Sequence, residues 1–149
     1  MTCMSKVKGR DVAYDIEKNV GFLLAKAYQR GFAIFKEHLT EYNITPPQFS
    51  LMAFLWKKDG LSQAELSEKS QIDRTTMVGL VDRLEKEGLV KRMPHPEDRR
   101  AYRVCLTKNG RSLEEPLCRI AGRVTETFTS GLSANEVETL RVILDKIRK

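Results

Sequence analysis

The sequence predicts a mainly α-helical fold with one small β-hairpin, and three observations predict it. Apolar residues recur at intervals of three and four through most of the 149 residues, which is the period of an α-helix. Residues 102–107 instead alternate apolar and polar side chains, which is the period of a β-strand. Serine, threonine and aspartate precede several apolar runs at the spacing of helix N-caps. A chain of this length fits a single domain.

The first element is a long helix. Residues 11–42 contain no proline and hold apolar side chains at helical spacing. We expect one helix, or two with a bend near Gly31, after a frayed polar leader. Its apolar stripe needs a partner, and a second copy of the chain is the simplest one. The dimer contacts predicted on this helix are Ile16, Val20 and Leu23.

The second helix begins after Thr45. Thr45 and Gln48 have the spacing of a capping box, and Pro46 suits the first helical position. Residues 49–56 are apolar nearly all round, which predicts a buried helix that ends at Gly60.

Residues 62–87 contain two further helix signals. Ser62 and Glu65 form a second capping box, and Asp73 can cap another helix after a short break. Gly88 follows where a left-handed residue would stop that helix. Its buried stripe, at i, i+3, i+4 and i+7, consists of Met77, Leu80, Val81 and Leu84. Two short helices with a tight turn predict a helix-turn-helix, whose second helix enters the DNA major groove N-terminus first.

A hairpin follows over residues 89–107. Pro94 and Pro96 stiffen its loop, and the loop tip carries Arg99 and Arg100. A hairpin in this place is a wing, and arginine side chains are well suited to a narrow minor groove.

The chain closes with helices. Thr107 can cap a helix that Pro116 should kink or break. Ser133 and Glu136 form a third capping box before a final amphipathic helix. The dimer contacts predicted on that helix are Leu140, Leu144 and Ile147.

These motifs closely resemble the MarR family of winged-helix transcriptional regulators. The resemblance is carried by the segments TPPQFSLMAFL, LSQAELSEKSQIDRTTMVGLVDRLEKEGLVKR and PEDRRAYRVCLTKNG. The most specific part is a D-x-R wing followed by L-T and a glycine, which matches Asp98, Arg100, Leu106, Thr107 and Gly110.

The resemblance implies a fold in two layers. Terminal helices of two subunits, residues 11–42 and 108–149, would interlock into a homodimer. The winged units, residues 45–107, would hang below it. Small ligands often bind between the two layers in this family, and Phe32, His38 and Tyr42 could line such a site, although the sequence selects none of them.

The residues expected to contact DNA lie on the second helix of the motif and on the wing. They are Arg74, Thr75, Thr76, Gly79, Arg83, Lys86, Arg99 and Arg100. Many members of the family carry a polar or basic residue where this chain has Gly79. The glycine removes one possible base contact and permits close approach of the backbone to DNA. Asp98 is expected to brace Arg100 by a charge-assisted hydrogen bond. The net charge of +6 also suggests a polyanionic partner.

Other classes of site have little support. His38 and His95 are far apart with no cysteine at ligand spacing, so we expect no metal and no cofactor. No arrangement of side chains supports catalysis, so we expect no enzyme.

No apolar run approaches the ~20 residues of a membrane span, and the N-terminus lacks the core of a signal peptide, which predicts a cytoplasmic protein. An odd number of cysteines, Cys3, Cys105 and Cys118, fits reduced thiols in that compartment.

The sequence thus predicts a homodimeric, sequence-specific regulator of transcription that binds a pseudo-palindromic operator in double-stranded DNA. We expect a repressor released by a small aromatic or phenolic ligand. Two alternatives stay open. One is a regulator switched by cysteine oxidation, and the other is a winged-helix protein-interaction module that binds no DNA.

Overall fold

The computed structural model describes residues 4–7 and 10–149. In chain order its strands and α-helices are β1 (Met4–Val7), β2 (Arg10–Ala13), α1 (Val20–Leu39), α2 (Pro46–Lys57), β3 (Leu61–Ser62), α3 (Gln63–Ser70), α4 (Arg74–Lys86), β4 (Val90–Pro94), β5 (Tyr102–Leu106), α5 (Lys108–Ser112), α6 (Glu114–Phe128) and α7 (Ala134–Ile147). Short 3-10 helices precede and follow α1 at Ile16–Lys18 and Thr40–Tyr42. The predicted mainly α fold with a small sheet is confirmed.

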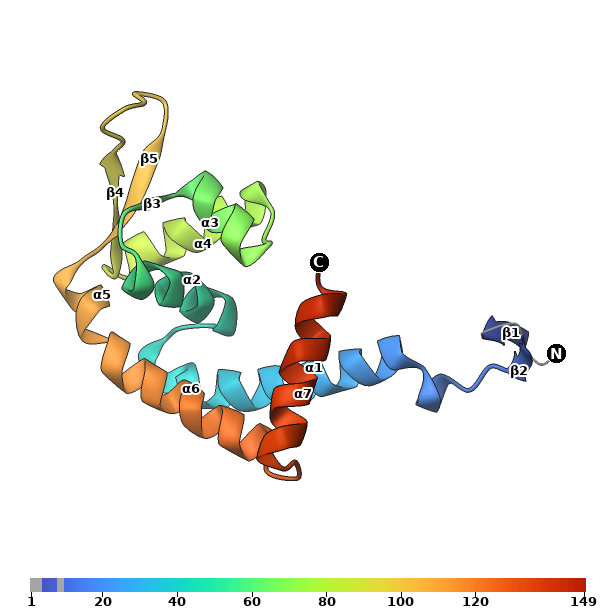
Figure 1. Cartoon of the computed structure of the whole chain (residues 1–149). Coiled ribbons are helices and arrows are strands. Elements are labelled where there is room, and N and C mark those ends of the chain that lie inside the picture. The colour runs from blue at the N-terminus through green and yellow to red at the C-terminus, as the bar shows by residue number, and fades with distance from the viewer. Residues whose placement is uncertain (1–3, 8–9) are drawn as a thin grey trace.

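The elements form two layers (Figure 1). Helices α1 and α6 pack along one another and form the lower layer. The unit of α3, α4 and the β4–β5 hairpin stands above them, and α2 connects the two layers. Helix α7 follows α6 after a short turn and has no buried residue. Among the residues described, no helix is long and apolar enough to cross a membrane.

The N-terminal region differs from the sequence prediction. The long helix begins at Val20 instead of near residue 11, because the side chain of Asn19 caps it by accepting from the amide of Phe22 at 3.0 Å. Residues 4–7 and 10–13, expected to be frayed or helical, pair as an antiparallel hairpin. Helix α1 runs through Gly31 without ending, and Gly31 lies against the ring of Phe128 on α6.

Helix α2 is the buried helix that the sequence predicts. The capping box of Thr45 and Gln48 is present, with both reciprocal hydrogen bonds formed. Leu51, Met52 and Leu55 are essentially inaccessible to solvent. This helix therefore carries the core shared by the two layers.

The helix-turn-helix is also confirmed. Ser62 and Glu65 cap α3, and Asp73 caps α4 by accepting from the amide of Thr76 at 2.8 Å. The predicted stripe of α4 is buried and consists of Met77, Leu80, Val81 and Leu84. The chain leaves α4 through Gly88, which has a φ of 72°. A left-handed residue there costs least when it is glycine.

The wing belongs to a three-stranded antiparallel sheet in the order β3-β5-β4. Strands β4 and β5 were predicted, but β3 was not. It consists of Leu61 and Ser62 only, and Leu61 pairs with Val104. Two residues are too few to show a period-two pattern, so the sequence gives no signal for this strand.

Helices α5 and α7 begin at the predicted caps, and α6 ends at Phe128, three residues before Gly131, where the sequence predicted its end. Thr107 caps α5, and the helical path breaks at Leu113, three residues before Pro116. The capping box of Ser133 and Glu136 begins α7.

Candidate DNA-binding interface and effector cleft

The N-terminal turn of α4 is open to solvent. Arg74, Thr75 and Thr76 are all exposed, as are Arg83 and Lys86 further along the helix. Gly79 lies on this side too, and a methyl group added there would meet nothing within 4 Å. The helix can therefore approach a groove edge closely at Gly79, and its polar side chains surround that point.

The two threonines are not equivalent. The hydroxyl of Thr76 donates to Asp73 at 2.7 Å, and its backbone amide donates to the same carboxylate. These hydrogen bonds hold the pKa of Asp73 below its usual value, the hydroxyl contributing most. Because Thr76 uses its hydroxyl proton in the helix cap, Thr75 is the better placed of the two to donate to a base.

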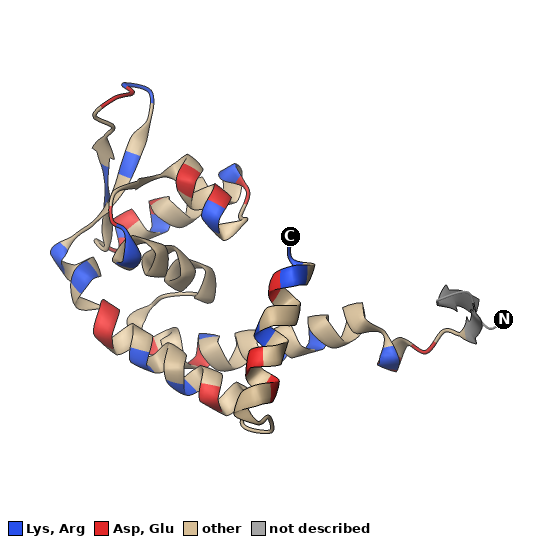
Figure 2. Ribbon diagram, in the orientation of Figure 1, with Lys and Arg blue, Asp and Glu red and all other residues tan. Residues whose placement is uncertain are grey.

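The wing tip is exposed and basic. Figure 2 shows Lys or Arg at the tip of the β4–β5 loop, beside acidic residues. Asp98 braces this tip, but differently from the prediction. Its carboxylate accepts from the backbone amide of Arg100 at 2.9 Å, and its carbonyl accepts from Ala101. A short aspartate side chain readily reaches an amide two residues on, which favours this turn over the expected contact with the guanidinium. The side chains of Arg99 and Arg100 are exposed.

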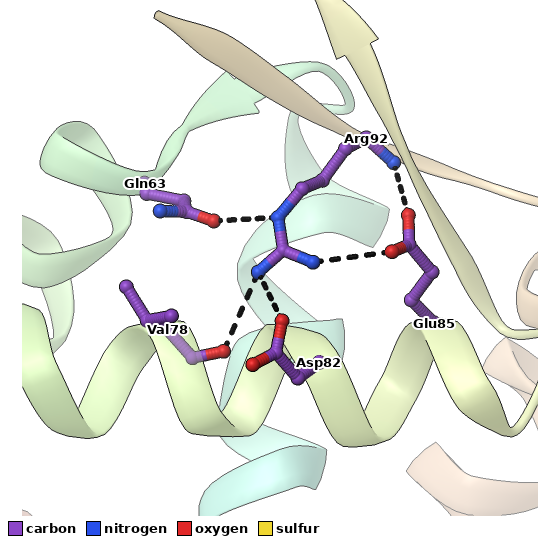
Figure 3. Close-up of polar contacts among 5 residues, drawn as sticks. All are labelled: Gln63, Val78, Asp82, Glu85 and Arg92. Atoms are coloured by element: carbon purple, nitrogen blue, oxygen red, sulfur yellow. Dashed lines mark hydrogen bonds and ion pairs between the residues drawn. The ribbon is translucent and has the colours of Figure 1, made fainter.

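Arg92 on β4 forms a polar hub that the sequence did not reveal (Figure 3). Its guanidinium lies 2.6 Å from Asp82 and 3.1 Å from Glu85, and it donates to the Gln63 side chain at 2.9 Å. It also donates to the Val78 carbonyl, and the Arg92 amide donates to Glu85 at 2.8 Å. The side chain is only 19% exposed. One residue at the base of the wing therefore holds α3 and α4 in place.

A second junction joins α2 to the wing. One carboxylate oxygen of Asp59, just after α2, accepts from the amide of Leu106 on β5 at 2.8 Å. The other lies 3.2 Å from the guanidinium of Arg111. The end of α2 is thereby tied to the strand that carries the wing.

Gly110 belongs to the motif that resembles the MarR family, and glycine is required there for a steric reason. A Cβ there would lie 2.1 Å from the carbonyl oxygen of Leu89, so only glycine fits without a shift of the backbone. The close approach also lets the indole of Trp56 donate to the Gly110 carbonyl at 2.9 Å. Helix α2 is thus fixed to α5 as well.

An aromatic cleft of about 470 Å³ lies between the two layers. It is formed by α1, α2, the turn between α3 and α4, and the end of α6. Its lining residues are Ala27, Tyr28, Gly31, Phe32, Phe35, Pro46, Pro47, Ser50, Ile72 and Phe128. Of the three candidates for a ligand site, only Phe32 lines it. His38 and Tyr42 line a separate polar cleft with Arg119 and Arg123.

The predicted dimer contacts are all exposed in the single chain: Ile16, Val20, Leu23, Leu140, Leu144 and Ile147. The structure adds Ile143, which is 47% exposed on α7 and escaped the sequence prediction. Exposed apolar side chains on neighbouring turns of one helix mark a surface that another chain can cover.

The surroundings of the two thiols that the structure describes, Cys105 and Cys118, do not favour the thiolate. Partial burial, with the nearby Asp59 carboxylate, raises the pKa of Cys105 above its usual value. Desolvation and Glu114 raise the pKa of Cys118 in the same way. A reactive cysteine needs a lowered pKa, because the thiolate is the reactive form. Cys3 lies outside the residues that the structure describes.

Comparison with known proteins identifies the family of this chain. Residues 44–102 match the model of the MarR family. The HTH-type transcriptional repressor NicR of Pseudomonas putida is 36% identical over 134 residues, which cover 90% of this chain and 85% of NicR.

Two solved structures are similar over most of both chains. One is Bordetella bronchiseptica BpsR, whose DNA binding is regulated by 6-hydroxynicotinic acid. It shares 30% identity at a TM-score of 0.88 and covers 93% of this chain and 99% of that one. The other is an E. coli MarR variant bound to operator DNA, with 29% identity, a TM-score of 0.81 and coverage of 86% and 92%. The chain belongs to the MarR family of winged-helix transcriptional regulators.

Proposed function

We propose that this chain is a homodimeric repressor that binds a pseudo-palindromic operator and is released by a small aromatic ligand. One observation carries the proposal. The exposed N-terminal turn of α4, with Arg74 and Thr75, stands beside a wing tipped by Arg99 and Arg100. A helix for the major groove and a basic hairpin for the minor groove are what a winged-helix DNA reader needs. The similarity to a repressor and to an operator-bound structure supports it.

The proposed dimer sets the form of the operator. Two copies related by a two-fold axis present two α4 helices, so they read an inverted repeat. Its half-sites are expected about one helical turn apart, roughly 34–36 Å, or a multiple of that. Phosphate contacts from arginine and lysine supply affinity, and base contacts near Thr75 supply sequence choice.

Selection of bound duplexes from random DNA, followed by binding measurements over a range of salt, tests this function. Log K should fall with log salt by ~0.9 for each phosphate neutralised. The selected sequence should be an inverted repeat. A flat salt response with no selected sequence would favour the alternative of a protein-interaction module instead.

The effector is proposed to bind in the aromatic cleft. Its volume of about 470 Å³ suits a small planar molecule, and four of its ten lining residues are aromatic. Helix α2 lines this cleft and is tied to β5 through Asp59 and to α5 through Trp56, so a ligand that shifts α2 is expected to shift the winged unit, and α4 with it, relative to its copy. Release follows if the ligand binds better to a dimer whose reading helices are wrongly spaced for the operator.

Titration with 6-hydroxynicotinic acid and a panel of benzoic and hydroxybenzoic acids tests the cleft. At least one compound should weaken operator binding by the wild-type protein. Phe32→Ala should abolish that response but retain operator binding, because Phe32 lines the cleft from α1, outside the winged unit. Phe22→Ala, on the same helix but outside the lining, is the matched control and should respond normally.

A further inference from the structure

A polar cleft of about 420 Å³ lies between α6 and the end of α1 with the 3-10 helix that follows it. We call it the charged cleft. It shares no lining residue with the aromatic cleft. Val20 and Leu23, the dimer contacts proposed on α1, lie at the opposite end of that helix. The residues that line the charged cleft are Glu37, His38, Glu41, Tyr42, Pro116, Arg119, Ile120 and Arg123.

The two walls of this cleft carry opposite charges. Glu37 and Glu41 lie on the side of α1, whereas Arg119 and Arg123 lie on the side of α6. Each pair has a spacing of four residues, which sets like charges side by side on a helical surface. Such a pair is unfavourable unless a group of opposite charge lies beside it. Each wall therefore favours a partner of the opposite sign.

The two walls do not supply that partner to each other. Within residues 4–7 and 10–149, the side chains of Glu37, Glu41 and Arg123 take part in no ion pair. Arg119 pairs with Glu115, which lies on its own helix. Opposite charges that line one cleft without touching leave room for a molecule that contacts both.

We propose that the charged cleft binds a small zwitterion, namely an α-amino acid with an apolar side chain. The carboxylate of the ligand accepts from Arg123 and Arg119, because a guanidinium presents its donors in a fork that matches a carboxylate. The ammonium group donates to Glu37 and Glu41. A volume of about 420 Å³ is within the range of sites for small molecules.

The balance of charge selects this class of ligand over simple ions. A dicarboxylate would bring negative charge against two glutamates, and a diamine would bring positive charge against two arginines. Unpaired like charges of this kind discriminate against the wrong ligand. An amino acid carries one charge of each sign a few bonds apart, so it leaves neither wall without a partner.

His38 adds an acceptor for the ammonium group. Its Nδ1 lies 2.8 Å from the carbonyl oxygen of Ile34, which can only accept. Nδ1 is therefore the donor, and Nε2 is the acceptor of the neutral ring. Together with Glu37 and Glu41, His38 gives the cleft three acceptor side chains for the three N–H donors of an ammonium group.

The remaining lining residues explain the choice of an apolar side chain. Tyr42, Pro116 and Ile120 are half-buried, and Tyr42 and Ile120 pack against the hydrophobic core. These three side chains offer no charge to the ligand. An aliphatic or aromatic side chain of the amino acid would lie against them and lose its contact with water.

Calorimetric titration of the full-length protein with leucine, isoleucine, valine, methionine and phenylalanine tests the proposal. At least one of these amino acids should bind saturably. Its N-acetyl derivative lacks the ammonium group, and its N-methyl amide lacks the carboxylate. Each derivative should bind about tenfold or more weakly, the size of a lost charge-assisted hydrogen bond.

Two sets of variants assign each charge of the ligand to its wall. Arg123→Gln should weaken binding of the amino acid about tenfold and should lose most of the discrimination against the amide. The double variant Glu37→Gln with Glu41→Gln should instead lose the discrimination against the N-acetyl derivative. Circular dichroism of each variant checks the fold.

Two further variants are matched controls. Lys36→Gln on α1 and Glu126→Gln on α6 each remove an exposed charge outside the lining of the cleft. Both should bind the amino acid and discriminate against its derivatives as the wild type does. A change in either control as large as that of Arg123→Gln would mean that the net charge of the helices, not the cleft, governs binding.

The remaining outcomes are equally decisive. If none of the five amino acids binds at millimolar concentration, the proposal is wrong. If an amino acid and its two derivatives bind equally, neither charge is recognised and the proposal is again wrong. If Arg123→Gln binds and discriminates as the wild type does, the ligand occupies another site. None of these measurements uses DNA, so their outcome is separate from that of the proposed function.

Discussion

The guanidinium of Arg92 lies 2.6 Å from the carboxylate of Asp82, which ties the base of the wing to the exposed face of the reading helix. Asp82 is 60% exposed on α4, whereas Arg92 is mostly buried. A partly buried cation that also holds Glu85 and Gln63 has little freedom to move. The distance between the two DNA-reading elements is therefore set within the protein, before DNA is present.

Arg92→Ala should lower the free energy of unfolding by about 1–3 kcal/mol, because charged hydrogen bonds are lost and Glu85 keeps only its bond from the backbone. Urea unfolding monitored by circular dichroism measures this. Lys91→Ala, the exposed neighbour on β4, is the control and should change stability by no more than about 0.5 kcal/mol. Equal effects of the two substitutions would show that the hub contributes nothing.

Arg92→Ala should also weaken operator binding without changing the salt dependence of that binding. Arg92 faces carboxylates instead of DNA, so its removal takes away positioning and no phosphate contact. Arg92→Lys should restore little, because an ammonium group cannot reproduce the fork of contacts. A drop of ~0.9 in the slope of log K against log salt would mean that Arg92 itself meets a phosphate.

Gly110→Ala and Gly79→Ala should act in opposite directions. A methyl group at Gly110 would clash with the Leu89 carbonyl at 2.1 Å and force α5 away from the sheet. We expect a loss of about 1–3 kcal/mol in stability, or failure to fold. At Gly79 nothing lies within 4 Å, and alanine should stabilise the helix by about 0.5–1 kcal/mol. Thermal unfolding of both variants checks this pair, and a destabilised Gly79→Ala would contradict it.

Much of the fold could be predicted because the signals are local. A capping box is complete within four residues, so the starts of α2, α3 and α7 were readable at Thr45, Ser62 and Ser133. The buried stripe of α4 likewise lies within a single helix. The start of α1 was misplaced because an aspartate and an asparagine both offer caps before Val20, and the apolar spacing continues past them.

The contacts that unite the site were not predictable, because their partners are distant in the sequence. Arg92 could be recognised only as one basic residue among several until its neighbours from α3 and α4 were known. Strand β3 depends on pairing with residues more than forty positions away. The aromatic cleft likewise gathers residues from three helices and the turn between α3 and α4, and the sequence had suggested only Phe32 among them.

Cys105 and Cys118 should be slow to react at neutral pH. A raised pKa keeps each thiol protonated at pH 7, and the thiolate fraction grows only as the pH rises through that raised pKa. In a Cys3→Ser background, alkylation of Cys105 and Cys118 by iodoacetamide at pH 7 should be slower than that of an unstructured cysteine peptide. Rapid alkylation, or loss of operator binding with stoichiometric peroxide, would revive the redox alternative.

The last prediction concerns the dimer. Leu140 and Leu144 are both more than one-third exposed on α7, which begins at the capping box of Ser133 and Glu136. If a second chain covers them, the surface that each leucine still exposes contributes up to about 1 kcal/mol, and an aspartate in its place would be buried without a partner. Leu144→Asp acts in both subunits, so it should raise the dimer dissociation constant by more than roughly 100-fold. Light scattering at micromolar concentration measures this, with Thr139→Asp on the same helix as the control.

Because a monomer holds only one half-site, Leu144→Asp should also reduce operator affinity while circular dichroism remains unchanged. A wild-type protein that is already monomeric at that concentration would remove the basis for an inverted-repeat operator, since a single α4 helix has no two-fold partner.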